Sequence, residues 1–189
     1  MDDSHPALSD EEIAVQVQGG DKELFGVLME RYEQKLLRYG RKFLSSPDNI
    51  EDIVQDVFMS AYQNIKSFNS SRRFSPWIYR IAHNAYVNEL KKNSHMPITL
   101  PDLDTLLSHT IYEDPAELER EQKDMKRMIE EGLEKIPLKY KEILLLRYYE
   151  DMDYKEMADV LGVPVGTVSV RLKRAREQLK KAWDTSHNA

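Results

Sequence analysis

The sequence contains no cysteine, and this absence excludes disulfide bonds, thiol nucleophiles and cysteine-ligated metals. Its five histidines are scattered, at positions 5, 83, 95, 109 and 187, without the spacing of a metal site. It has only seven glycines and no glycine-rich phosphate loop. We therefore expect no enzyme activity, no metal and no cofactor. A chain without cysteine is also typical of a reducing cytoplasm.

A long hydrophobic run is missing as well. No apolar stretch approaches the roughly 20 residues that span a bilayer. The first residues, MDDSHPALSDEE, are too acidic and polar for a secretory signal. We expect a cytoplasmic protein with no membrane contact of its own. Apolar residues make up 41% of the chain and charged residues 32%, a balance typical of a soluble, helix-rich protein.

Positive charge is scarce overall but concentrated locally. The 27 Lys and Arg against 33 Asp and Glu give a net charge of −6. Residues 94–118 hold five acids and no Lys or Arg, whereas residues 165–181 hold six Lys or Arg and one Glu. A uniformly acidic protein would repel DNA, but a local basic surface binds it with salt-sensitive affinity.

Apolar residues recur every three or four positions, which predicts amphipathic helices. Ser9 and Glu12 have capping-box spacing, Pro47 suits the first turn of a helix, and Ser75 begins another helix. The predicted fold class is all-α, with two small helical domains over 9–93 and 119–184 and a flexible acidic linker over 94–118. The two longest apolar stripes are Leu24, Leu28, Tyr32, Leu36, Tyr39 and Phe43, and Ile50, Ile53, Val54, Val57, Phe58, Ala61 and Ile65.

Residues 154–183, YKEMADVLGVPVGTVSVRLKRAREQLKKAW, have the pattern of a DNA-binding helix-turn-helix. Gly162 suits a left-handed turn, and Pro164 suits the first turn of the second helix. One face of that helix is predicted to pack inward: Val165, Val168, Leu172, Ala175, Leu179 and Trp183. The candidates for contact with duplex DNA, within a motif placed at about Tyr154 to Lys173 and just beyond it, are Thr167, Ser169, Val170, Arg171, Lys173, Arg174 and Arg176.

Within this candidate set, residues from Val165 to Arg171 are expected to reach base edges, and the later cations to hold phosphates. Val165 and Val170 cannot hydrogen-bond a base, so contact with a thymine methyl is the most they offer. The alternative is an ordinary solvated basic helix that follows a helical hairpin.

The polar loop over 67–74 and the helix after it form a second candidate surface. Indole, amide and guanidinium groups on one helical face suit single-stranded DNA, because they stack on bases, read base edges and follow phosphates. The alternative is a packed tryptophan beside a solvated face. The candidate residues are Asn69, Ser70, Ser71, Arg72, Arg73, Trp77, Arg80, Asn84, Asn88 and Lys91.

A third candidate surface is the acidic face of residues 51–58, EDIVQDVF. Glu51, Asp52, Gln55 and Asp56 share one side of a predicted helix, which suits docking to a basic protein. Solvated surface is the alternative. A catalytic carboxylate pair has no support, since no histidine or other base accompanies it.

Three blocks in this order resemble the extracytoplasmic-function (group IV) sigma factors of bacterial RNA polymerase. They are EDIVQDVFMSAYQNI, FSPWIYRIAHNAYVNELKK and IPLKYKEILLLRYYEDMDYKEMADVLGVPVGTVSVRLKRAREQLKK. The resemblance implies that 9–93 is sigma region 2 and 119–184 is sigma region 4. It further implies that the segment from Asp52 to Ile65 docks on core RNA polymerase through Asp52, Gln55, Asp56, Phe58 and Tyr62.

The resemblance also assigns promoter DNA to the other two surfaces. The loop and helix from 67 to 91 would recognise and open the −10 element as a single strand, and the helix-turn-helix would read the −35 element as a duplex. An anti-sigma factor is an implied partner. The acidic linker would imitate a polyanion in a channel of the polymerase, or would be a merely flexible tether.

Two other classes of protein compete with this interpretation. A stand-alone regulator with a C-terminal helix-turn-helix would leave the block over 51–92 unexplained. An enzyme built on a helical bundle would require a polar or metal-binding cluster inside the bundle, and the sequence offers none.

Overall fold

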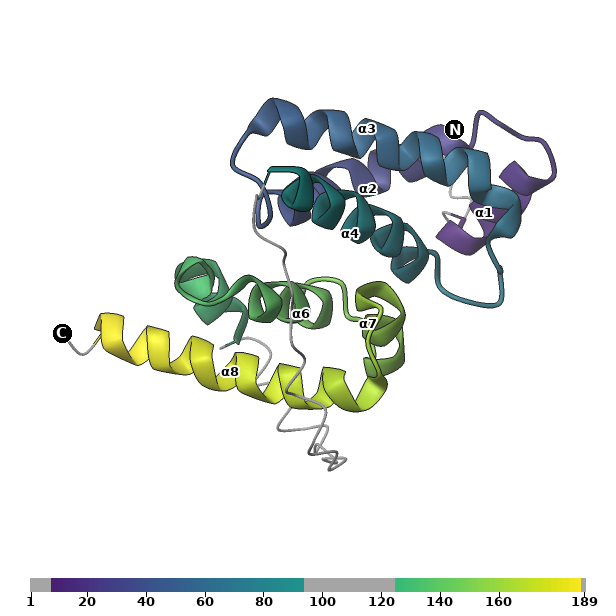
Figure 1. Cartoon of the computed structure of the whole chain (residues 1–189). Coiled ribbons are helices and arrows are strands. Elements are labelled where there is room, and N and C mark those ends of the chain that lie inside the picture. Colours follow the sequence, from purple (N-terminus) through teal and green to yellow (C-terminus); the bar gives the residue numbers. More distant parts are fainter. Residues whose placement is uncertain (1–7, 94–124, 188–189) are drawn as a thin grey trace, which may run out of the picture. The chain divides into compact units, whose positions relative to one another are not determined.

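The computed structural model of the chain describes residues 8–93 and 125–187, which belong to two compact units (Figure 1). Every regular element of the described residues is a helix, as the sequence predicted. The predicted linker over 94–118 lies outside the described residues. No helix in the described ranges is long and apolar enough to cross a membrane.

In the N-terminal unit, residues 8–93 form four α-helices and one short 3-10 helix. These are α1 (Asp10–Gln18), α2 (Phe25–Gly40), α3 (Pro47–Asn64), η1 (Ile65–Ser67) and α4 (Phe74–Asn93). The predicted capping box is present, because the Ser9 side chain accepts from the Glu12 amide and the Glu12 carboxylate accepts from the Ser9 amide. These hydrogen bonds lower the pKa of Glu12. Pro47 occupies the first turn of α3, as predicted.

Both predicted apolar stripes pack inward, except that Leu24 is only half-buried. The last helix of this unit, α4, differs from the prediction in where it begins. It begins at Phe74, one residue before Ser75, and it buries Tyr79, His83 and Tyr86 completely or nearly so. The Tyr86 hydroxyl donates to the Leu36 carbonyl at 3.0 Å, and burial raises the pKa of that hydroxyl.

Tyr86 reaches this position because α2 has no side chain at Gly40. A Cβ at Gly40 would lie 2.5 Å from both the Cζ and Oη atoms of Tyr86. The glycine is therefore required by close approach between α2 and α4.

Gly40→Ala should lower the free energy of unfolding of the N-terminal unit by about 1–3 kcal/mol, because the methyl group overpacks the site against Tyr86. Gly26→Ala is the matched control, since nothing lies within 4 Å of a Cβ there. It should raise stability by up to about 1 kcal/mol through helix propensity. Urea unfolding followed by Trp77 fluorescence, in a Trp183→Phe background, measures both. Equal shifts for the two variants would contradict the close-approach explanation.

The C-terminal unit contains helical residues 125–132, η3 (Leu133–Lys135), α6 (Leu138–Tyr148), α7 (Tyr154–Leu161) and α8 (Val165–His187). Asp153 and Glu156 form a capping box at the start of α7. Gly162 ends α7 with φ 65°, the left-handed turn that the sequence predicted. Pro164 lies just before α8 rather than in its first turn, and its carbonyl accepts from the amides of Thr167 and Val168.

The inward face of α8 consists mainly of residues predicted for it. Val168, Leu172, Ala175 and Leu179 are almost inaccessible to solvent. Val165 and Trp183 were assigned to the same face, but Val165 is 48% exposed and Trp183 is half-buried. Val165 is the first residue of α8, directly after the turn, so it lies at the edge of the core.

Candidate nucleic-acid and protein interfaces

The start of α8 exposes fewer polar side chains than the sequence predicted. Thr167 and Arg171 are 3% and 2% exposed, so this structure does not present them on the surface where the sequence placed them. Both lie beside the apolar stripe, one residue from Val168 and Leu172 respectively, and turn into the core. Among the other candidates Lys173 is exposed, and Ser169, Val170 and Arg174 are half-buried.

Arg171 turns inward because α6 presents a buried acid to it. The Arg171 Nη1 atom lies 3.5 Å from the Glu142 Oε1 atom, and the two side chains are 3% and 8% exposed. Glu142 stands in an otherwise apolar segment of α6, EILLL. A carboxylate in such a segment requires a cationic or hydrogen-bonding partner. The sequence shows this acid beside an apolar run, but it does not identify Arg171 as the partner, because only the packing of α6 against α8 brings the two side chains together.

Arg176 is held against α6 as well. Its Nε atom donates to the Tyr148 hydroxyl at 2.7 Å, and its guanidinium lies 5.8 Å from the centre of the Tyr148 ring. The arginine is half-buried, so it presents less of its charge to solvent than Lys173 does. The cationic outer surface of α8 is therefore smaller than a count of its basic residues indicates.

Arg171→Ala should lower the free energy of unfolding of the C-terminal unit by about 3 kcal/mol, because it leaves Glu142 buried without this partner. The double variant Arg171→Met, Glu142→Leu should lose less, since neither charge remains. Lys173→Ala, at an exposed position of the same helix, should stay within about 0.5 kcal/mol. Urea unfolding followed by Trp183 fluorescence, in a Trp77→Phe background, distinguishes the three. Equal small losses would show that the pair contributes little.

In the N-terminal unit, α4 presents a polar face that matches the prediction in position. Arg80, Asn84, Asn88 and Lys91 are all exposed, at steps of three and four. Trp77 is half-buried, with its ring centroid 5.4 Å from those of Phe68 and Phe74. The sequence left open whether Trp77 packs in the core or faces a DNA strand. In the structure one part of the indole packs in an aromatic cluster and another part remains accessible.

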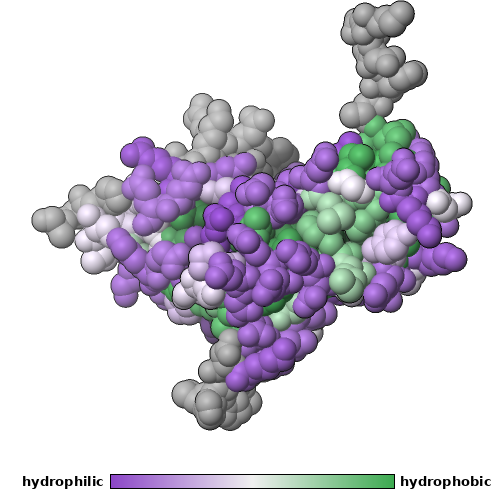
Figure 2. Space-filling view, turned by 90° about the horizontal axis from the view of Figure 1, so that it is seen from above, coloured by the Kyte–Doolittle hydropathy of each residue, from purple (hydrophilic) through white to green (hydrophobic). Residues whose placement is uncertain are grey.

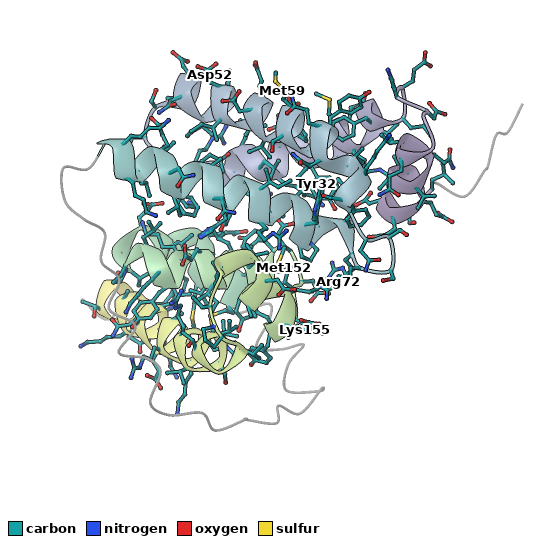
Figure 3. All side chains as sticks on the ribbon, turned by 45° about the vertical axis from the view of Figure 1, so that its right-hand side comes forward. Tyr32, Asp52, Met59, Arg72, Met152 and Lys155 are labelled. Atoms are coloured by element: carbon teal, nitrogen blue, oxygen red, sulfur yellow. The ribbon has the colours of Figure 1, made fainter. Side chains whose placement is uncertain are left out.

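The loop before α4 contains a local turn made by its own hydrogen bonds. The Asn69 Oδ1 atom accepts from the amide and the hydroxyl of Ser71, at 3.0 and 2.8 Å. Asn69 therefore forms a local turn, and Ser70, Ser71, Arg72 and Arg73 are exposed around it. Arg72 projects from the end of the unit where α4 begins (Figure 3).

The acidic face of α3 is exposed, but not all of the residues predicted for the docking surface are exposed on it. Asp52, Gln55 and Asp56 are exposed, whereas Phe58 is 4% exposed and belongs to the core. Phe58 is therefore not on the exposed acidic face, because it continues the apolar stripe from Val54. Tyr62 is half-buried, and its ring packs edge-on against Phe25 with centroids 5.1 Å apart.

Met59 is the residue of this face that the prediction missed. It is 59% exposed, the highest value among the large apolar side chains of the described residues. It stands three residues after Asp56 and seven after Asp52, and it shares their outer side of α3 (Figure 3). Apolar residues interrupt the largely hydrophilic surface seen from above, the side on which α3 lies (Figure 2). Helical spacing from Asp52 would have found Met59.

The described residues contain no group of histidines and acids able to hold a metal ion. A pocket of about 320 Å³ lies between α1 and the loop, lined by Glu11, Glu12, Val15, Gln16 and Ser70. Its two carboxylates make it unsuitable for a phosphate group.

Comparisons with known proteins match two families along the chain. The family described as Sigma-70 region 2 matches residues 28–96, and Sigma-70, region 4 matches residues 126–179. The chain is 32% identical over 182 residues to an ECF RNA polymerase sigma-E factor of Haemophilus influenzae, with 92% of this chain and 94% of that protein covered. It is 30% identical over 172 residues to the ECF RNA polymerase sigma factor SigW of Bacillus subtilis, covering 88% and 92%.

Two solved structures are similar in fold. CnrH, in complex with the cytosolic domain of CnrY, has a TM-score of 0.64 and 25% identity, with 93% of this chain and 97% of that chain covered. The sigma factor RpoE of Bartonella quintana, in complex with the anti-sigma factor NepR, has a TM-score of 0.59 and 22% identity, covering 85% and 96%.

Proposed function

The chain belongs to the extracytoplasmic-function sigma factors of the sigma-70 family, and we propose how its surfaces divide the work of such a factor. As a sigma factor it binds core RNA polymerase and directs promoter-specific initiation of transcription. We assign the polymerase to the outer face of α3, the −10 element to the loop and α4, and the −35 element to α8.

The observation that carries this proposal is the separation of charge within the N-terminal unit. One helix, α3, exposes Asp52, Gln55 and Asp56, while α4 exposes Arg80 and Lys91 among amides. The acidic face would repel a phosphate backbone, so it suits a basic protein. The cationic and amide face suits a nucleic acid strand. A stand-alone duplex reader would have no use for two such surfaces in one small unit.

Polymerase docking on α3 rests on Met59 together with the acids around it. An exposed, flexible thioether among polar neighbours is the kind of apolar anchor that binding surfaces use. Asp52, Gln55 and Asp56 would form its polar rim, and Tyr62 would extend it along α3. Phe58 supports this surface only from within the core.

Opening of the −10 element is assigned to the loop over 69–73 and to the polar face of α4. The accessible part of Trp77 offers a stacking surface, Asn84 and Asn88 offer amide groups, and Arg80 and Lys91 offer positive charge. Unstacking a base costs a few kcal/mol, and contacts of these kinds with the exposed strand would offset that cost.

The −35 element is assigned to the accessible side of α8. With Thr167 and Arg171 buried, its contacts would come from Val165, Ser169, Val170, Lys173 and Arg174. We expect apolar contact with thymine methyl groups from the valines and contact with phosphates or guanines from the cations.

Several further properties follow from family membership and remain proposals. We propose that the chain acts in the cytoplasm, has no catalytic activity of its own and is held inactive by an anti-sigma factor. CnrH and RpoE, which resemble it in fold, are bound to the cytosolic domain of CnrY and to NepR. We also propose that the acidic linker over 94–118 occupies a cationic channel of the polymerase as a polyanion would.

Transcription reconstituted from core RNA polymerase tests the central proposal. Adding this chain should make initiation start at specific promoters, selected from a library with randomised −35 and −10 elements. Initiation that is equally promoter-specific without the chain would exclude the proposed function.

Replacing the five acids of the linker by amides should weaken core binding or initiation at moderate salt.

Met59→Ala should weaken binding to core polymerase by about tenfold, the effect of truncating an apolar anchor in a protein interface. Val15→Ala is the matched control, since Val15 is also an exposed apolar residue (46%) but lies on α1. Fluorescence anisotropy of labelled chain titrated with core polymerase measures both affinities. Equal affinities for the two variants would remove Met59 from the docking surface.

A further inference from the structure

The first helix of the chain holds both ends of the loop that precedes α4. At the start of the loop, the Gln18 Nε2 atom donates to the carbonyls of Ile65 and Phe68, at 2.7 and 2.8 Å. At its end, the Phe74 amide donates to the Glu11 Oε1 atom at 2.8 Å. Helix α1 lies outside residues 28–96, which match the region 2 family. The region 2 match therefore does not by itself describe what α1 does.

Helix α1 is itself firmly attached to the core. Ile13, Ala14 and Val17 are buried, and Asp10 accepts hydrogen bonds of 2.6 Å from Arg31 and from the Tyr32 hydroxyl, both on α2. The Tyr32 ring in turn meets Phe74, the first residue of α4, edge-on with centroids 5.5 Å apart. The contacts that hold the loop thus come from a helix that is fixed in place.

The two anchors divide the segment into fixed ends and an accessible middle. Phe68 and Phe74 are buried in the aromatic cluster with Trp77, whereas every residue from 69 to 73 is exposed. The backbone of an exposed loop samples many conformations unless its ends are held. A loop that is already ordered loses less conformational entropy when it captures a ligand.

We propose that Gln18 and Glu11 are positioning residues for −10 opening, holding the loop over 69–73 in the conformation that captures the exposed strand. The inference rests on the proposed function of that loop. Neither side chain needs to touch DNA, because each acts through a backbone group at one end of the loop.

Glu11 offers a test in which charge and hydrogen bonding predict opposite results. Removing an acid beside a DNA-binding surface should raise affinity for DNA if only charge matters. Glu11→Met removes both the charge and the acceptor for the Phe74 amide, whereas Glu11→Gln removes the charge but keeps an acceptor. If Glu11 positions the loop, Glu11→Met should weaken strand capture about fivefold, the effect of one hydrogen bond, and Glu11→Gln should not.

Gln18→Met removes two hydrogen bonds at similar side-chain length, so its expected loss is larger, about tenfold. Gln34→Met, at an exposed position on α2, controls for the chemistry of the substitution. The experiment uses holoenzyme made from the full chain and a promoter fragment that the wild-type holoenzyme selects from a randomised library. Permanganate reactivity of unpaired thymines measures opening, and binding of the non-template −10 oligonucleotide measures strand capture.

The expected result is a loss of opening and strand capture for Gln18→Met and Glu11→Met, with core binding and the thermal unfolding midpoint close to those of Gln34→Met. Wild-type opening by both variants would overturn the inference and leave the proposed function intact. Losses in opening matched by equal losses in core binding and unfolding midpoint would show a purely structural role and also overturn it. Failure of the wild-type holoenzyme to open any selected promoter would instead refute the proposed function.

Discussion

The helices that carry the candidate surfaces, α3, α4 and α8, each divide their circumference between a stripe that the core buries and a stripe that remains for partners. Both units are small, so a helix such as α3 or α8 has one inward side, and a residue's angle decides its role. A shift of one position, about 100° around the helix, separates a core residue from a surface residue. Phe58 and Met59 are such neighbours: the first is 4% exposed and the second 59%.

The separation of charge among these exposed stripes matters more than the net charge of −6. An acidic protein is a poor ligand for DNA when its charges are spread evenly. Here the acids of α3 and the cations of α4 occupy different helices of one unit, and α8 adds Lys173 and Lys180 on exposed positions of the other. A factor that reaches DNA as part of a polymerase needs only local cationic surfaces, since the polymerase contributes the rest of the affinity.

Buried and half-buried polar side chains connect the surfaces to the cores beneath them. The Arg171–Glu142 pair ties α8 to α6 at the level where α8 would meet DNA. Glu11 and Gln18 likewise tie α1 to both ends of the loop before α4. In each case the sequence alone predicted no partner within the protein for the polar side chain. In the structure that side chain forms a hydrogen bond or an ion pair with another group of its own unit. These contacts limit how far the candidate surfaces can move relative to their cores.

The sequence by itself determined the all-helical class, both apolar stripes of the N-terminal unit, the capping box at Ser9 and the left-handed turn at Gly162. These features depend on local periodicity and on backbone preferences that neighbouring residues specify. The outer residues Asp52, Arg80, Asn84 and Lys173 were also placed correctly on exposed positions. The family resemblance, carried by motifs over most of the chain, is confirmed by the comparisons.

Only the tertiary structure decided which candidates face solvent at the edges of the stripes. Thr167 and Arg171 turned inward, because burial at a stripe's edge depends on what the neighbouring helix presents there. Glu142 on α6 is the decisive neighbour for Arg171, 29 residues earlier in the chain. Gln18 and Ile65 are 47 residues apart. Helical spacing relates residues within one helix, whereas pairings of this kind arise only when the helices pack.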